Sequence, residues 1–115
     1  MIKVEIKTNA EKMSLRLKVK GHSAQAERGQ DIVCASASIL TYTVAQVLKD
    51  MGEKNKLTTE PVIILKDGNA TVSCICKTEE DYYEALSTFN VAYVGYILLS
   101  HNYPQFVEVS LVGKA

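Results

Sequence analysis

A histidine and a cysteine lie close together near the start of the chain, in the segment GHSAQAERGQDIVCASAS. Eleven residues separate His22 from Cys34, and glycines occupy positions 21 and 29. A thiolate can attack an acyl carbon, while an imidazole accepts the thiol proton and returns it to the leaving amine. The pair therefore supplies the minimum for a cysteine hydrolase, with Cys34 as nucleophile and His22 as general base and acid.

The expected place of Cys34 in a helix favours this chemistry. A helical pattern of apolar residues runs from Asp31 to Met51, and Gly52 follows as a stop signal. If Asp31 caps this helix, Cys34 lies in the first turn, where unpaired backbone N–H groups and the helix dipole favour an anion such as a thiolate. The same N–H groups would stabilise an oxyanion.

Several of these residues have a second interpretation. Cys34 can instead fill the core while His22 lies on a surface turn, because sequence spacing alone is a weak signal for a catalytic pair. Asp31 either caps the helix, the more common role, or orients His22 as a third catalytic group. Gly21 and Gly29 are expected to support the site. Ser36 and Ser38 are the candidates for substrate binding.

Size and composition restrict the class of protein. The 115 residues fit a single domain spanning residues 1–115. An apolar fraction of 47% with 23% charged residues is typical of a globular protein, and no uninterrupted apolar run is long enough to span a bilayer. The alternating Met1 to Lys7 segment lacks the apolar core of a signal peptide. We therefore expect a cytoplasmic protein without a membrane partner.

The charge distribution along the sequence argues against nucleic-acid binding. Thirteen basic residues balance thirteen acidic ones. The strongest local basic character is the thin scatter of Arg16, Lys18 and Lys20. Binding by phosphate neutralisation needs a larger patch than this, so direct nucleic-acid binding is not expected.

Apolar periodicity predicts the elements that must position the site. Alternation over residues 2–7 and 13–19 indicates a β-hairpin. A second hairpin is indicated by the segments Val62 to Leu65 and Ala70 to Cys76, which flank the turn signal Asp67-Gly68-Asn69. A final strand is expected from Phe106 to Leu111. Thr78 begins a second helix that ends near Ser100. The order β-β-α-β-β-α-β predicts an α+β domain, with an antiparallel β-sheet and two helices packed on one face.

The other two cysteines alternate on a predicted strand. With Cys34 and His22, Cys74 and Cys76 nominally make four zinc ligands, but the spacing is not that of a zinc knuckle. Both sulfurs fall on the apolar face of the strand, so core filling is favoured. We expect no metal and no cofactor. His101, at the end of the second helix, is expected to interact with the helix dipole.

The second half of the second helix is apolar around much of its circumference. A single contact with a sheet cannot cover so wide an apolar surface. A homodimer is the simplest explanation. The residues concerned are Val91, Val94, Tyr96, Ile97, Leu98 and Leu99.

The motif around the two candidate catalytic residues resembles that of a known family. Gly21-His22 followed by G-x-D-I-V-C-A at residues 29–35 is similar to the signature of the ribosomal-processing cysteine proteases, the Prp family. The resemblance covers the whole chain in length and element order. It implies that His22 and Cys34 form the catalytic dyad. It also implies that the substrate is the precursor of large-subunit ribosomal protein L-twenty-seven, which loses a short N-terminal extension, and that the enzyme is a homodimer.

Small departures from the family pattern affect substrate contacts more than chemistry. Ser23 and Ser36 replace the more usual alanine, and Ala37 replaces valine. The alternative function is a non-catalytic ribosome-associated or adaptor protein of the same fold. Such a protein would have no need of a thiolate.

Overall fold

The computed structural model describes residues 1–21 and 30–114. The elements within these ranges follow the predicted order β-β-α-β-β-α-β. They are β1 (Ile2–Asn9), β2 (Ser14–Lys20), α1 (Gln30–Glu53), β3 (Val62–Lys66), β4 (Asn69–Ile75), α2 (Glu79–Asn102) and β5 (Val107–Lys114).

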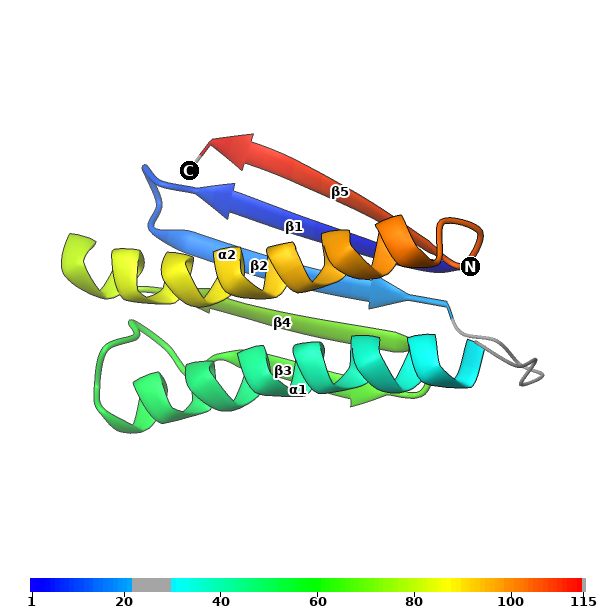
Figure 1. Cartoon of the computed structure of the whole chain (residues 1–115). Coiled ribbons are helices and arrows are strands. Elements are labelled where there is room, and N and C mark those ends of the chain that lie inside the picture. Colours follow the sequence, from blue (N-terminus) through cyan, green and yellow to red (C-terminus); the bar gives the residue numbers. More distant parts are fainter. Residues whose placement is uncertain (22–29, 115) are drawn as a thin grey trace.

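The strands form one five-stranded sheet in the order β3-β4-β2-β1-β5. Three of the four pairings are antiparallel, as expected, but β5 pairs with β1 in parallel. The crossover explains this difference. Because β4 is antiparallel to β2 and β2 is antiparallel to β1, β4 runs in the direction of β1. Helix α2 then returns along the sheet, so β5 starts at the same end as β1 (Figure 1).

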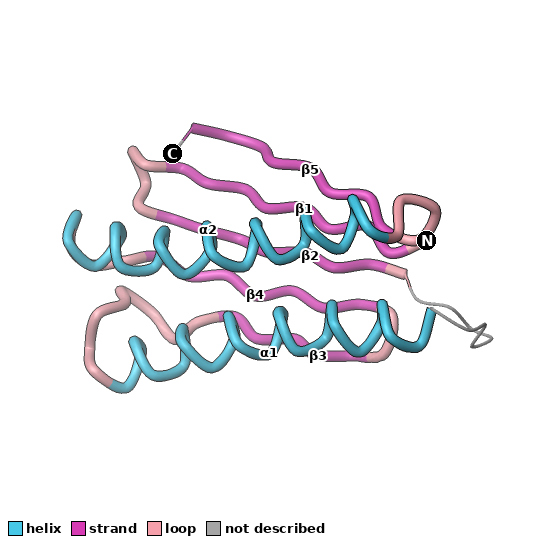
Figure 2. The backbone as a smooth tube through the Cα atoms, in the orientation of Figure 1, coloured by secondary structure: helices cyan, strands magenta, loops and turns pink. Residues whose placement is uncertain are grey.

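Both helices cover the same face of the sheet, which confirms the predicted two-layer arrangement (Figures 1 and 2). Ile2, Val4 and Ile6 alternate along β1 and are buried beneath the helices. On α1, Val33, Ala37, Val44, Leu48 and Met51 form the buried stripe. Burial of each large aliphatic side chain contributes about 1.5–3 kcal/mol, so this single layer of contacts fixes where α1 lies.

Helix α2 begins and packs through specific contacts. Thr78 is its N-cap, and the Asp81 N–H donates to the Thr78 hydroxyl at 3.1 Å, as the capping pattern predicts. Gly95 allows α2 to approach α1, because a Cβ at this position would lie 2.7 Å from Leu40 Cδ2. The two helices therefore pack as one layer.

Helix α1 is unusually apolar for its length. Within residues 32–53 an 18-residue window has a mean hydropathy of 1.4, and by length and composition alone the segment is able to cross a membrane. About 33% of that window is buried, in the stripe that packs against the sheet. A core helix has the same composition, so hydropathy does not separate the two roles.

Candidate active site

The helix that carries Cys34 starts earlier than predicted. Helix α1 begins at Gln30, so Asp31 is inside the first turn and the prediction that it is the N-cap was wrong. An acidic residue is favoured in a first turn as well as at the cap, and the sequence signal for the two positions is the same. Cys34 is consequently the fifth residue of α1. Its own N–H can pair within the helix, whereas the unpaired donors belong to the four residues before it.

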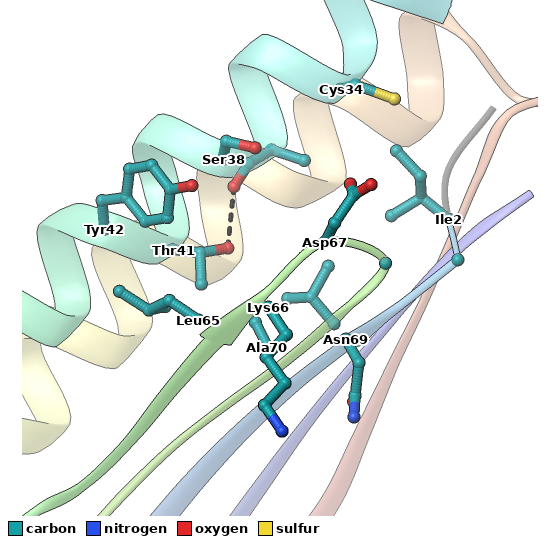
Figure 3. A pocket seen from close by; sticks show the side chains of 14 residues that line it. Ile2, Cys34, Ser38, Thr41, Tyr42, Leu65, Lys66, Asp67, Asn69 and Ala70 are labelled. Carbon is teal, nitrogen blue, oxygen red and sulfur yellow. Dashed lines mark hydrogen bonds between the residues drawn. The ribbon is translucent and has the colours of Figure 1, made fainter. Parts of the chain in front are cut away.

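Cys34 lies at one end of a cleft between α1 and the β3–β4 hairpin. The cleft has a volume of about 230 Å³. Cys34, Ser38 and Tyr42 line its helical side at four-residue intervals, because side chains one turn apart share a face of a helix (Figure 3). Cys34 is half-buried, and Tyr42 is exposed. A peptide in this cleft would therefore contact the thiol.

The opposite wall of the cleft comes from the hairpin. Leu65 belongs to β3, while Asp67 lies in the turn that joins β3 to β4. In Figure 3 the Asp67 carboxylate points toward α1, whereas the Lys66 side chain points away from it. The cleft thus has an apolar and an acidic side chain facing the helix.

Gly21 connects this hairpin to the end of β2. Its N–H donates to the Gly68 carbonyl oxygen at 3.0 Å. Its φ is 92°, and a Cβ would lie 2.2 Å from the Met1 carbonyl oxygen. Only glycine satisfies both conditions without moving the backbone. Gly21 therefore fixes the backbone just before position 22, in agreement with a supporting role. His22 and Gly29 themselves lie outside the described residues.

The structure separates the two serines proposed for substrate binding. Ser38 lines the cleft with Cys34. Ser36 does not line it, and its hydroxyl donates to the Ile32 carbonyl oxygen at 2.7 Å within the helix. Sequence reasoning missed Tyr42 and Asp67. The four-residue spacing from Cys34 could have identified Tyr42, whereas Asp67 depends on how the hairpin packs against α1.

Thr41 anchors the floor of the cleft. Its hydroxyl donates to the Ala37 carbonyl oxygen at 2.7 Å (Figure 3) and accepts a hydrogen bond from the Tyr96 hydroxyl at the same distance. Burial raises the pKa of Tyr96 to about 12, partly offset by the hydrogen bond with Thr41. The phenol therefore remains protonated at neutral pH and holds α1 against α2 directly beneath the site.

Cys74 and Cys76 occupy a different environment. Both lie in the core, with exposed fractions of 5% and 0%, which confirms the core-filling prediction. A hydrogen bond with Cys76, together with burial, raises the pKa of the Cys74 thiol. Among the described residues no group of three or more His, Cys, Asp or Glu side chains could hold a metal ion. His101 is exposed in the last turn of α2.

Solved structures with the same fold include proteins from S. aureus and Streptococcus mutans. Prp from S. aureus, in complex with a substrate peptide, is 21% identical with a TM-score of 0.69, and the match covers 96% of this chain and 99% of that one. Protein SMU.848 from Streptococcus mutans is 23% identical with a TM-score of 0.71, over 99% of this chain and 96% of that one. A second S. aureus Prp complex, with a covalently linked product peptide, is 21% identical with a TM-score of 0.66, over 96% and 99%. At these identities the likeness shows the fold.

The sequence itself provides the assignment to a family. No curated protein matches the chain significantly. The family model of the cysteine protease Prp, however, matches residues 1–108, which include the helix that carries Cys34 and the hairpin that faces it. Because this match spans nearly the whole chain, the protein belongs to the Prp family of cysteine proteases.

Proposed function

We propose that this protease is a ribosomal-processing endopeptidase that removes the N-terminal extension of large-subunit ribosomal protein L-twenty-seven. The observation that carries the proposal is the position of Cys34 beside a cleft, while the other two cysteines are buried. The S. aureus Prp of the same fold is described as a ribosomal processing protease and was crystallised with substrate and product peptides. The proposed substrate extends the family assignment to one ribosomal protein.

The proposed mechanism uses Cys34 and His22. His22 takes the thiol proton, and the Cys34 sulfur attacks the scissile carbonyl carbon to form a tetrahedral intermediate. When the C–N bond breaks, the imidazolium gives the proton to the leaving amine and a thioester remains. Water, deprotonated by His22, then hydrolyses the thioester and restores the thiol. Asp31 supports the reaction either through the first turn of α1 or by orienting His22.

The length of the cleft limits how much substrate it contacts. Cys34 and Tyr42 are eight residues apart on α1, a rise of about 12 Å. An extended peptide advances about 3.3 Å per residue, so this side of the cleft faces about four substrate residues. Ser38 offers a hydroxyl to the peptide backbone midway, and Tyr42 with Leu65 offers apolar surface farther from the thiol.

Mass spectrometry of the precursor ribosomal protein tests the proposal. Incubation with the protease should release the extension as one peptide and leave the mature protein. Folded Cys34→Ala and His22→Ala should release none, since one lacks the nucleophile and the other the proton acceptor. Full cleavage by folded Cys34→Ala would disprove the assignment. Absence of cleavage by the unaltered protein would favour the non-catalytic adaptor.

The proposal includes a cytoplasmic homodimer. Val91, Val94 and Leu98 on α2 are exposed, Val91 to 74%. Tyr96, which the sequence pattern placed on this surface, is instead fully buried. An apolar groove of about 340 Å³ between α1 and α2 adjoins Val91 and is lined also by Leu40 and Val47. A second copy of the chain would cover this surface.

Sedimentation of a single variant tests the dimer. The unaltered protein should sediment as a dimer at micromolar concentration, and Val91→Asp should sediment as a monomer. Leu111→Asp, at an exposed apolar position on β5, serves as the control and should remain dimeric. A monomeric unaltered protein would contradict the proposal.

A further inference from the structure

The sheet face that the helices leave open gathers basic side chains from separate parts of the sequence. Buried residues of β1 alternate with Lys3 and Lys7, which point to the open face. Strand pairing places Lys20 opposite Lys3 and Arg16 opposite Lys7. Paired residues on neighbouring strands share a face, so the same register assigns further residues to it. The six cations assigned to this surface, here called the basic face, are Lys3, Lys7, Arg16, Lys18, Lys20 and Lys66.

The basic face carries a large share of the charge of the chain. Among the side chains that the structure describes, Glu5 and Glu108 are the carboxylates that share it, which leaves an excess of four positive charges. The rest of the sequence then holds seven basic and eleven acidic residues, out of thirteen of each. A chain with no net charge therefore has a strongly uneven distribution of charge.

The arrangement within the basic face opposes folding. Lys3 lies directly opposite Lys20, and Lys7 directly opposite Arg16. Like charges at directly paired positions destabilise a sheet. Glu5 relieves part of this repulsion through its ion pair with Arg16 at 3.4 Å. Stability would be better served by an acidic residue at position 20, so the cations point to an anionic partner.

The chemistry of the basic face favours phosphate groups. Alternate residues of a strand are about 6.7 Å apart and neighbouring strands about 4.8 Å, which gives a regular array of cations. The hydroxyls of Thr71, Ser73 and Ser110 share the face and can donate to phosphate oxygens. A shallow hollow of about 250 Å³ is lined by Lys3, Lys18 and Lys20, together with Ser110 and the carboxylates Glu5 and Glu108.

We propose that the basic face binds the phosphate backbone of single-stranded RNA. The face-directed residues of β1, β2 and β4 include no aromatic side chain for base stacking, so binding should be independent of sequence and sensitive to salt. The choice of RNA over DNA rests on the proposed ribosomal function. The affinity of the face for a polyanion does not depend on that function, because it follows from the cations themselves. The cleft with Cys34 lies on the helical side of the sheet and shares Lys66 with the basic face, so RNA bound over Lys3, Lys18 and Lys20 would leave the thiol accessible.

Fluorescence anisotropy with a labelled oligouridylate tests the proposal. The unaltered protein should bind at about 50 mM salt and weaken steeply as salt increases. The double variant Lys18→Ala, Lys20→Ala should bind about tenfold more weakly. The slope of log K against log salt concentration should be shallower by about 1.4, since each phosphate that is no longer neutralised removes about 0.7. Lys49→Ala, Lys54→Ala, at the end of α1 and just after it, changes the net charge equally and should bind as the unaltered protein does.

Two further measurements separate binding from folding and from catalysis. Thermal unfolding of the Lys18, Lys20 double variant should occur at about the same temperature, because the lost repulsion between Lys3 and Lys20 offsets the lost attraction between Lys18 and Glu5, which are also directly paired. Its peptide cleavage should be unchanged, and Cys34→Ala should bind RNA normally even if the proposed substrate is wrong.

Several outcomes would overturn the proposal. One is the absence of RNA binding at about 50 mM salt, and another is that the Lys49, Lys54 control weakens binding as much as the Lys18, Lys20 variant does. A third is tighter binding of an oligodeoxynucleotide of equivalent sequence. The remaining two are that polyglutamate, or anionic lipid vesicles, bind as tightly as the RNA. The last two would assign the face to an acidic protein or to a membrane.

Discussion

The three cysteines of this protein lie in two environments, which differ mainly in whether a substrate can reach the sulfur. Cys34 is half-buried beside a cleft near the start of α1, while Cys74 and Cys76 lie in the core. The buried pair hydrogen-bonds internally, which together with burial raises the pKa of Cys74. Cys74 is therefore a poor nucleophile. The same hydrogen bond lowers the pKa of Cys76, but that thiol is fully buried and out of reach of a peptide. The fold therefore favours Cys34, the proposed nucleophile, over the other two sulfurs.

Alkylation should give the largest contrast between the two environments. Iodoacetamide should modify Cys34 about 10³-fold faster than Cys74 or Cys76, because the buried thiols react only when the core opens at a cost of several kcal/mol. Peptide mapping after timed quenching measures each rate. Equal rates at all three cysteines under native conditions would remove the distinction.

Substitution of Gly21 should impair the accessible cysteine site. Gly21→Ala places a Cβ 2.2 Å from the Met1 carbonyl oxygen at a φ of 92°. The backbone before His22 must then shift, and we expect at least about a tenfold loss of kcat/KM, or about 1.4 kcal/mol of transition-state stabilisation. Peptide cleavage kinetics measure the loss. Full activity in this variant would show that the position of Gly21 does not matter to the site.

A change beneath the cleft should affect stability. Thr41→Val removes the hydroxyl that accepts from Tyr96, leaving a buried phenol without its partner. The free energy of unfolding should fall by about 1–3 kcal/mol. Urea denaturation measures the difference, and Thr43→Val, at an exposed position of the same helix, is the control. Equal stability of Thr41→Val and the control would show that this hydrogen bond does not hold the helices together.

Removal of a buried sulfur should have the smallest effect on activity. Cys76→Ala leaves a small cavity, so the midpoint of urea denaturation should fall while cleavage continues. If Cys76→Ala remained folded but were as inactive as Cys34→Ala, a buried cysteine would be required for catalysis and the assignment to Cys34 alone would be wrong.

Local patterns predicted most of the fold. Alternation in β1 and β2, the Asp67-Gly68-Asn69 turn and the Thr78 cap are encoded within a few residues, and each was found as expected. The parallel direction of β5 was not predicted, because it depends on a crossover spanning the sheet. At the site, Cys34 and Ser38 share a helical face that spacing reveals, whereas Asp67 faces α1 only after the hairpin packs. Strand alternation alone also indicates that Lys3, Lys7, Arg16 and Lys18 lie on the open face, whereas Lys20 and Lys66 join them only through strand register.

The pairing of the first and last strands has a consequence for the order of folding. Ile2, which lines the cleft, is paired with Val107 at the start of β5. Contacts between residues so distant in sequence require closure of a long loop before they contribute energy, and such topologies fold slowly. One wall of the cleft is therefore completed late. A partly synthesised chain would contain Cys34 but not the finished cleft, so we expect no proteolytic activity until β5 has been synthesised and has paired with β1.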